Sequence, residues 1–139
     1  MAKLFIDVES EAEMIAAGKT IAADLKAGDV VALKGQLGAG KTHLSKGIVA
    51  ALGSADEVTS PTFSLVQEYQ GGSLPIFHFD FYRLDDVSEL LRLGWDEYLD
   101  EDGVILVEWA DKFPEVMPER VYWFDLAIEA DGRHTVTER

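Results

Sequence analysis

A chain of 139 residues has the length of one ordinary domain, and its 47% of hydrophobic and 27% of charged residues are typical of a globular protein. Its formal net charge of −14 disfavours autonomous binding of nucleic acid, because such a surface repels a phosphate backbone, and favours a protein partner with a basic face. The sequence has no cysteine and no apolar run of membrane-spanning length, which excludes disulfides, thiolate metal sites and membrane helices, and we expect a cytoplasmic location.

The first two predicted elements are a strand and a helix. Residues 3–8 alternate between apolar and polar and predict a strand. Residues 10–28 predict a helix, with Ser10 as N-cap, Glu13 at the capping-box position and Gly28 just after its end. Three residues of this helix form a stripe that we expect to face the core: Met14, Ile21 and Leu25.

The next segment, GQLGAGKT at Gly35–Thr42, matches the phosphate-binding pattern G-x-x-x-x-G-K-[ST] in full. A true phosphate loop follows a buried strand and opens a helix. Val30–Leu33 form the apolar run of a strand covered on both faces, and after Thr42 apolar residues recur every four positions up to Gly53, where a helix would stop. We therefore predict a phosphate loop rather than a plain glycine turn.

The residue types of this loop explain how it would hold a phosphate. Glycines allow successive N–H groups to point at the phosphate, and the N-terminus of the following helix adds positive potential. Lys41 supplies a mobile charge for the β- and γ-phosphates, and the Thr42 hydroxyl is placed to ligate Mg²⁺. The loop residues that we expect to bind the nucleotide are Gly35, Gly38, Ala39, Gly40, Lys41 and Thr42.

The remaining elements follow this loop along the chain. Residues 61–84 predict two strands joined around Gly71 and Gly72, with Pro75 at the start of the second strand. After them come a short helix at 85–93, a continuous apolar strand at 103–110 and a closing hairpin at 120–139 that turns at Asp131-Gly132. These elements predict a single P-loop ATPase domain over 1–139. Its fold class is α/β, a P-loop NTPase-like three-layer fold with a mixed sheet of parallel core and antiparallel edge strands, whose order stays open.

Two carboxylates are candidates to complete a Mg²⁺ site, because in this fold class an acidic residue at the end of a neighbouring apolar strand lies near the metal. Asp80 lies in IFHFDFY, and Glu108 ends the run VILVE. Burying an unpaired carboxylate is costly, which favours a functional role over an exposed residue on a strand that has just surfaced. His78 has two open interpretations: it could orient a neighbouring group, or be a satisfied histidine on a half-buried strand.

Five segments, in this order and spacing, resemble the bacterial TsaE family, also known as YjeE: GQLGAGKT, TSPTFSLVQEY, FHFDFYRL, LGWDEYL and VILVEWADKFPEVMPE. The resemblance runs from about the first helix to the closing hairpin and is weaker at the C-terminus. The phosphate loop alone is shared with many families, whereas SPTF followed by H-x-D-x-YRL and VEWA is specific. The resemblance implies a small ATPase needed to make threonylcarbamoyladenosine in tRNAs that read codons beginning with A.

The resemblance also implies cofactors and partners. In this family the ATPase acts with TsaD and TsaB, which together transfer the threonylcarbamoyl group, and the ATPase does not perform that transfer itself. We therefore expect ATP and Mg²⁺ as cofactors, TsaD and TsaB as partners, and contact with tRNA only indirectly through the complex. Hydrolysis would reset the modifying enzyme between rounds.

Several single residues acquire roles from the resemblance. Thr42 resembles the Mg²⁺ ligand of the phosphate loop, and Asp80 resembles an aspartate essential for hydrolysis, near the metal and its waters. Glu108 resembles a second acidic residue close to the metal, so Asp80, Glu108 and Lys41 are the expected catalytic residues. One departure is His43, where many relatives carry a second threonine, and we expect it to leave the metal site unchanged.

Further residues are implied around the nucleotide. Ser60 and Thr62 match a loop comparable to a switch that senses the γ-phosphate, although hydroxyls beside a proline are also ordinary in turns. Trp109 resembles a tryptophan that follows the second acidic residue, with a half-buried aromatic anchor as its other interpretation. Glu11 and Arg133 mark the start of the first helix and the closing hairpin, which are implied to flank the nucleotide.

Two other function classes stay open beside an ATPase. A small-molecule kinase usually needs a lid with catalytic arginines, and Arg83 and Arg92 are the only arginines in the middle of the chain. A non-catalytic clamp would bind ATP and dock partners, with turnover too slow to matter. A regulatory GTPase is disfavoured, because the sequence has no N-K-x-D motif after a later strand to read guanine.

Overall fold

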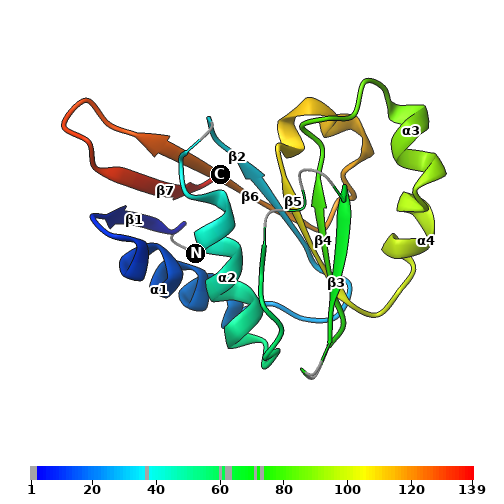
Figure 1. Ribbon diagram of the computed structural model, residues 1–139, viewed down its shortest axis with the longest axis horizontal. Coiled ribbons are helices and arrows are strands. Elements are labelled where there is room, and N and C mark those ends of the chain that lie inside the picture. The colour runs from blue at the N-terminus through cyan, green and yellow to red at the C-terminus, as the bar shows by residue number, and fades with distance from the viewer. Residues whose placement is uncertain (1–2, 37, 60, 62–63, 71, 73) are drawn as a thin grey trace.

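The computed structural model describes residues 3–36, 38–59, 61, 64–70, 72 and 74–139. Within these residues seven strands form one sheet, and helices cover both of its faces, which gives three layers (Figure 1). The strands are β1 Phe5–Val8, β2 Val30–Lys34, β3 Val66–Tyr69, β4 Ile76–Asp80, β5 Val104–Glu108, β6 Val121–Ile128 and β7 His134–Glu138. The helices are α1 Glu11–Ala22, α2 Lys41–Ala51, α3 Val87–Arg92 and α4 Trp95–Leu99, with 3₁₀ turns η1 Ala110–Lys112 and η2 Pro114–Val116.

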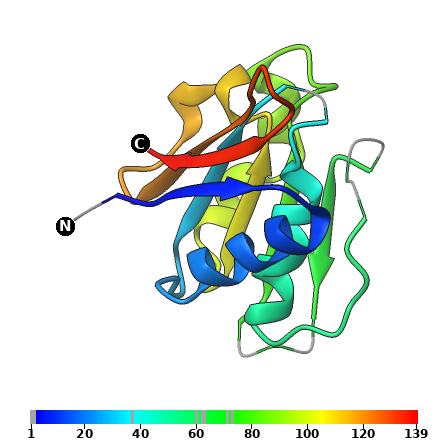
Figure 2. The ribbon, with the colours of Figure 1, turned by 90° about the vertical axis from the view of Figure 1, so that its left-hand side faces the viewer.

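The sheet has the predicted parallel core and antiparallel edges. Its strand order is β1-β7-β6-β2-β5-β4-β3. β2 pairs in parallel with both β5 and β6, and β4 pairs in parallel with β5. The outer pairs β3–β4, β6–β7 and β1–β7 are antiparallel, and Figure 2 shows β1 and β7 side by side at one edge. The predicted fold class is therefore confirmed, and the structure adds the strand order.

Two apolar cores lie on the two faces of the sheet, because side chains alternate along each strand. On one face Leu106 of β5 packs in a core with Met14 of α1 and Ile48 of α2. On the other face the core contains Phe79 of β4 and Trp95 of α4. β4 and β5 are buried along their whole length, as expected for strands covered on both faces.

Helices α1 and α2 approach each other closely at two glycines. A Cβ atom on Gly47 would lie 1.9 Å from the carbonyl oxygen of Ile15, and one on Gly18 would lie 2.2 Å from that of Leu44. Neither position has room for a side chain, so the two glycines allow the backbones to meet. Because α2 begins inside the predicted phosphate loop, its contact with α1 also fixes the position of that loop.

The first helix begins as predicted and ends earlier than predicted. Ser10 caps it, and the Ser10 hydroxyl accepts from the Glu13 N–H at 3.1 Å. The helix ends at Ala22, and not just before Gly28. The reason is local: the buried Asp29 carboxylate accepts from the backbone N–H three residues before it, at 2.8 Å, and this bond closes a turn where the helix was expected to continue.

One short helix, α4, is absent from the sequence prediction. It has only five residues and begins after Gly94, whose φ of 98° is typical of a helix end rather than a start. The other predicted strands and helices are confirmed, and β3 pairs antiparallel with β4 as the first predicted hairpin requires, while Gly71 of its predicted turn lies outside the described residues. The closing hairpin turns at Gly132, which has a φ of 89°. In the described parts of the chain, no helix is long and apolar enough to cross a membrane.

Candidate functional site

The predicted phosphate loop, Gly35–Thr42, joins the end of β2 to the start of α2. Gly40 has a φ of 107°, a backbone conformation that residues with a side chain rarely adopt, so this position favours glycine. Gly40 is also the N-cap of α2, and among the described residues no side chain caps this helix by a hydrogen bond. The N–H groups at the start of α2 are therefore available to an anion.

Lys41 lies buried inside this loop. Its Nζ donates to the carbonyl oxygens of Gly35 at 2.6 Å and Gln36 at 2.9 Å, and lies 4.3 Å from the centre of the Trp109 ring. Burial lowers the pKa of Lys41, while the negative charges of three nearby carboxylates oppose that shift. The loop thus holds an ammonium group among polar partners, the kind of group that binds a phosphate as a point charge.

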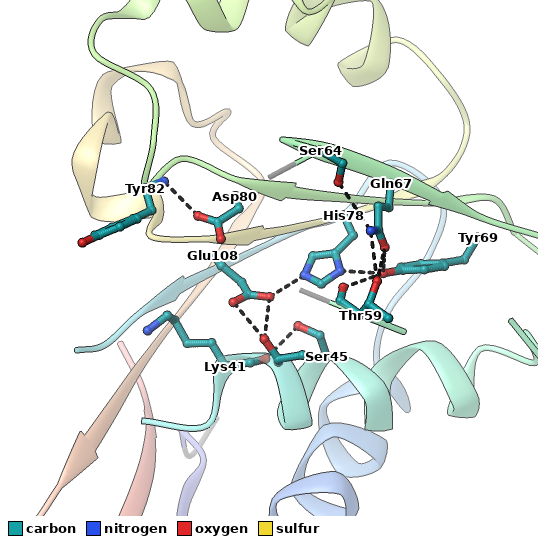
Figure 3. Close-up of polar contacts among 11 residues, drawn as sticks. Lys41, Ser45, Thr59, Ser64, Gln67, Tyr69, His78, Asp80, Tyr82 and Glu108 are labelled. Carbon is teal, nitrogen blue, oxygen red and sulfur yellow. Dashed lines mark hydrogen bonds and ion pairs between the residues drawn. The ribbon is translucent and has the colours of Figure 1, made fainter. Parts of the chain in front are cut away.

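The two predicted carboxylates lie on neighbouring strands, at the carboxyl ends of β4 and β5. The register pairs Asp80 with Glu108, and these residues are only 1% and 3% exposed. The Asp80 Oδ1 accepts from the Tyr82 N–H at 2.8 Å (Figure 3). The Thr42 hydroxyl lies 3.3 and 3.4 Å from the two oxygens of Glu108. The fold therefore gathers the predicted catalytic and metal-binding residues at the carboxyl ends of the central strands.

The oxygen atoms gathered here suit Mg²⁺, which prefers hard oxygen ligands. They come from the Thr42 hydroxyl and from the carboxylates of Asp80 and Glu108. Among the described residues, no group of three or more His, Cys, Asp or Glu side chains is arranged to hold a metal. Proteins commonly hold Mg²⁺ by one or two carboxylates together with substrate phosphates, so these residues fit Mg²⁺ that arrives with a nucleotide.

A pocket of about 400 Å³ lies beside the phosphate loop and is large enough for a small ligand. Its walls come from the start of α1, from the loop and from the closing hairpin, and include Glu11, Gly40 and His134. Glu11 therefore lines a pocket next to the phosphate loop, and its contact with a nucleotide stays a prediction. His43 also lines this pocket, and its Nε2 lies 3.6 Å from a carboxylate oxygen of Glu11.

The closing hairpin contributes to this pocket through residues next to Arg133 rather than through its guanidinium. Arg133 pairs with Asp7 at 2.6 Å and with Asp131 at 2.8 Å. His134 lines the pocket, and its Nδ1 lies 3.0 Å from the carbonyl oxygen of Ala39 in the phosphate loop. The sequence gives no signal for His134, because its contact joins residues that are 95 positions apart.

His78 faces the candidate site, which favours the first of its two interpretations. Its Nε2 lies 2.6 Å from a Glu108 oxygen, and its Nδ1 lies 2.9 Å from the hydroxyl of Tyr69. Burial, with a smaller effect of the Glu108 charge, raises the pKa of Tyr69 to about 12. Sequence reasoning missed Tyr69, although its place on the strand that pairs with β4 puts it near His78.

Trp109 is half-buried, directly after the carboxylate of β5, and has an unusual backbone conformation. Its φ of 58° is rare outside glycine. Its ring packs on Tyr82, with 4.8 Å between the ring centres, and faces Lys41 on the phosphate loop. Ser60 and Thr62, the predicted switch residues, lie outside the described residues.

Comparisons with known proteins identify the family to which this chain is similar. The family model described as "Threonylcarbamoyl adenosine biosynthesis protein TsaE" matches residues 8–137. A curated TsaE protein of Bacillus subtilis is 49% identical over 125 residues, which cover 90% of this chain and 78% of that protein. A TsaE protein of Treponema pallidum is 37% identical over 120 residues, which cover 86% and 88% of the two chains. Both relatives are named tRNA threonylcarbamoyladenosine biosynthesis proteins.

A solved structure has the same fold. The crystal structure of Bacillus subtilis YdiB superposes with a TM-score of 0.84 at 36% sequence identity, covering 99% of this chain and 84% of that one. The family match spans nearly the whole chain and includes the loop, both carboxylates and the closing hairpin. The chain therefore belongs to the TsaE family of threonylcarbamoyl adenosine biosynthesis proteins.

Proposed function

We propose that this protein binds ATP with Mg²⁺ and hydrolyses it, acting on a TsaD–TsaB transferase complex so that N6-threonylcarbamoyladenosine is formed in tRNA over repeated rounds. One observation carries the proposal: the buried Glu108 carboxylate of β5 lies against the hydroxyl of Thr42, and Thr42 belongs to the same phosphate loop as Lys41. The pathway is supported by the names of the curated relatives, which are tRNA threonylcarbamoyladenosine biosynthesis proteins.

The loop residues have the binding task in this proposal. N–H groups of the loop and of the start of α2 would hold the phosphates. Lys41 would exchange its two carbonyl partners, which belong to the same loop, for phosphate oxygens. Thr42 and Glu108 would hold the Mg²⁺, which when bound neutralises charge that develops on the phosphates during transfer.

Asp80 has the hydrolytic task. Its carboxylate is buried beside Glu108, and the Tyr82 N–H fixes the direction of one of its oxygens. A carboxylate held in this way can orient a water molecule and accept a proton from it. We infer adenine as the base, because no N-K-x-D motif is present to read guanine.

The acidic surface defines the partners in this proposal. At a net charge of −14 the protein would be repelled by tRNA, so contact with tRNA would pass through the transferase complex. The same charge would attract a basic face of that complex, and binding would weaken as salt is raised. A cytoplasmic location is part of this proposal and rests on the cysteine-free sequence.

A reconstituted modification assay tests the proposed function. TsaD–TsaB, tRNA and the other substrates are combined, and product is measured over a single round and over many rounds. We expect many rounds of product formation to require this protein, and the Lys41→Ala variant to support only a single round. The Lys46→Ala variant, which removes the same charge from the same helix outside the phosphate loop, should support many rounds like the unmodified protein.

Two results would contradict the proposal. Many rounds that proceed equally well without this protein, or with Lys41→Ala in its place, would overturn the function itself. Many rounds supported equally by an ATP analogue that resists hydrolysis would show a nucleotide-dependent clamp and remove the ATPase role.

A further inference from the structure

A buried chain of hydrogen bonds leads from the candidate site across the sheet to its edge strand (Figure 3). It begins at Glu108 on β5, passes through His78 on β4 at 2.6 Å and reaches Tyr69 on β3 at 2.9 Å. His78 is fully buried, and the other two residues are each 3% exposed. Three adjacent strands therefore each contribute one member of this polar chain.

Beyond Tyr69 the hydrogen bonds reach Gln67, which is also on β3, and Thr59, which precedes that strand. The Tyr69 hydroxyl lies 2.9 Å from Gln67 Oε1, and Gln67 Nε2 donates to the Thr59 hydroxyl at 3.0 Å. Leu65, directly before β3, has a φ of 70°, and its carbonyl oxygen accepts from the Asp80 N–H at 3.0 Å. Leu65 is thus joined directly to β4, the strand that carries Asp80.

Elementary chemistry sets the direction of the bond to Glu108. An ionised carboxylate can only accept, so Nε2 of His78 carries a proton and donates to Glu108 at 2.6 Å. The Tyr69 hydroxyl has one hydrogen: it either donates to a neutral Nδ1, or donates to Gln67 Oε1 while its oxygen accepts from a protonated Nδ1. In both arrangements Tyr69 holds the His78 ring with its Nε2–H toward one oxygen of Glu108, while the other oxygen lies 3.3 Å from the Thr42 hydroxyl.

An apolar core would not need this arrangement. Buried polar groups cost free energy unless each one is hydrogen-bonded, and hydrophobic side chains of similar shape could fill the same space. Hydrogen-bond partners that hold a metal-binding side chain from behind are a recognised way to fix its orientation, and their loss typically weakens metal binding by about 10- to 100-fold. The hydrogen bonds from Tyr69 through His78 to Glu108 hold the carboxylate from behind in this way.

We propose that Tyr69 and His78 are positioning residues. They hold the Glu108 carboxylate toward Thr42 and link it to Gln67 on β3 and to Thr59, so that binding of Mg²⁺ with nucleotide and the stability of β3 depend on each other. This rests on the proposed function, since it requires that Glu108 engages nucleotide-bound Mg²⁺.

The deciding variant is Tyr69→Phe, which removes the hydroxyl and keeps the ring. Calorimetry measures ATP binding over a series of Mg²⁺ concentrations and in EDTA. We expect the Mg²⁺ concentration that gives half of the maximal increase in ATP affinity to rise about tenfold in this variant. Its ATP affinity in EDTA should equal that of the unmodified protein. The matched control is Tyr98→Phe, which removes a tyrosine hydroxyl from the opposite face of the sheet and should change neither quantity.

Substitutions of His78 provide a test by rescue. His78→Leu removes both ring nitrogens, whereas His78→Gln retains an N–H donor that can face Glu108. We expect His78→Gln to recover part of the Mg²⁺ response that His78→Leu loses. Should His78→Leu fail to fold, the milder Tyr69→Phe still decides the question.

Amide hydrogen exchange provides a readout independent of activity. In the unmodified protein Mg²⁺ with ATP should slow exchange over residues 64–70, and in Tyr69→Phe this slowing should be lost. If Tyr69→Phe matches the unmodified protein in both Mg²⁺ response and exchange, the positioning role is wrong while the proposed function stands. If the unmodified protein itself shows no Mg²⁺-dependent ATP binding, the proposed function and this inference both fall.

Discussion

The two faces of β4 differ sharply in chemistry although they share one backbone. Phe77 and Phe79 point into an aromatic cluster, where Phe79 makes an edge contact with Trp95 at 5.0 Å between ring centres. His78 and Asp80 point to the other face and belong to the candidate site. All five residues of the strand are buried. The aromatic face stabilises the strand by burial and ring geometry, whereas the polar groups of the other face can be buried because they are hydrogen-bonded.

The largest effect should follow from breaking the aromatic face. Phe79→Ala removes a fully buried ring and should lower the free energy of unfolding by about 3–5 kcal/mol. Urea unfolding followed by circular dichroism measures this loss. Nucleotide affinity, measured at a temperature where the variant stays folded, should stay close to that of the unmodified protein. A large fall in affinity without a fall in stability would show that the two faces are not separable.

The reciprocal variant acts on the polar face of the same strand. Asp80→Asn keeps the oxygen that accepts from the Tyr82 N–H and removes the charge. ATP turnover in the presence of the transferase complex should fall by about 100-fold or more, the loss typical for one preorganised catalytic group. The unfolding midpoint in urea should move little. Turnover at the unmodified rate would mean that Asp80 is misassigned.

A smaller loss of stability is expected at the contact between α1 and α2, the helices that cover the polar face of the sheet. Gly47→Ala would place a methyl group against the backbone of α1 and force the two helices apart, at a cost of about 1–3 kcal/mol. Because α2 carries Lys41 and Thr42, nucleotide affinity should fall as well. Thermal unfolding and calorimetry on the same sample measure both effects. Lys46→Ala, at the neighbouring position, is the control and should change neither quantity.

The smallest effect is expected at the start of α1, which lies on the same side of the sheet as the polar face of β4. Ser10→Ala removes the cap of α1 beside the pocket and should lower the free energy of unfolding by about 1 kcal/mol. The loss should be recovered in part by Ser10→Asp, since aspartate is an equally good N-cap. Equal stability of the alanine variant would show that the Glu13 side chain, which accepts from the Glu9 N–H at 3.2 Å, is enough to begin the helix.

The sequence predicts most of the elements because their signals are local. The phosphate loop needs fixed residue types at fixed spacing, and its flanking strand and helix show in the next few positions. The end of α1 is predicted wrongly because Leu25 continues the apolar spacing, while the turn that ends the helix depends on Asp29 accepting a backbone bond. α4 is missed because five residues are too few to show a period.

The site is only half visible in the sequence. Lys41, Thr42, Asp80 and Glu108 follow from the loop and from strand ends, and the structure brings them together. The contacts of Tyr69 and His134 cannot be predicted in this way, because Tyr69 contacts His78 on a neighbouring strand and His134 contacts Ala39 in the phosphate loop. His78 and Glu108, for example, lie 30 positions apart and meet only because β4 and β5 pair in parallel. Strand order decides such contacts, and local patterns do not contain it.

The contact between Lys41 and Trp109 gives the protein a built-in optical probe. An indole ring that lies 4.3 Å from an ammonium group senses the field of that charge, so its fluorescence should change when the charge moves. The other two tryptophans lie elsewhere, Trp95 buried in the aromatic cluster and Trp123 beside Arg139. In a protein whose only indole is Trp109, emission would record whether Lys41 has left the ring, in real time and without a label.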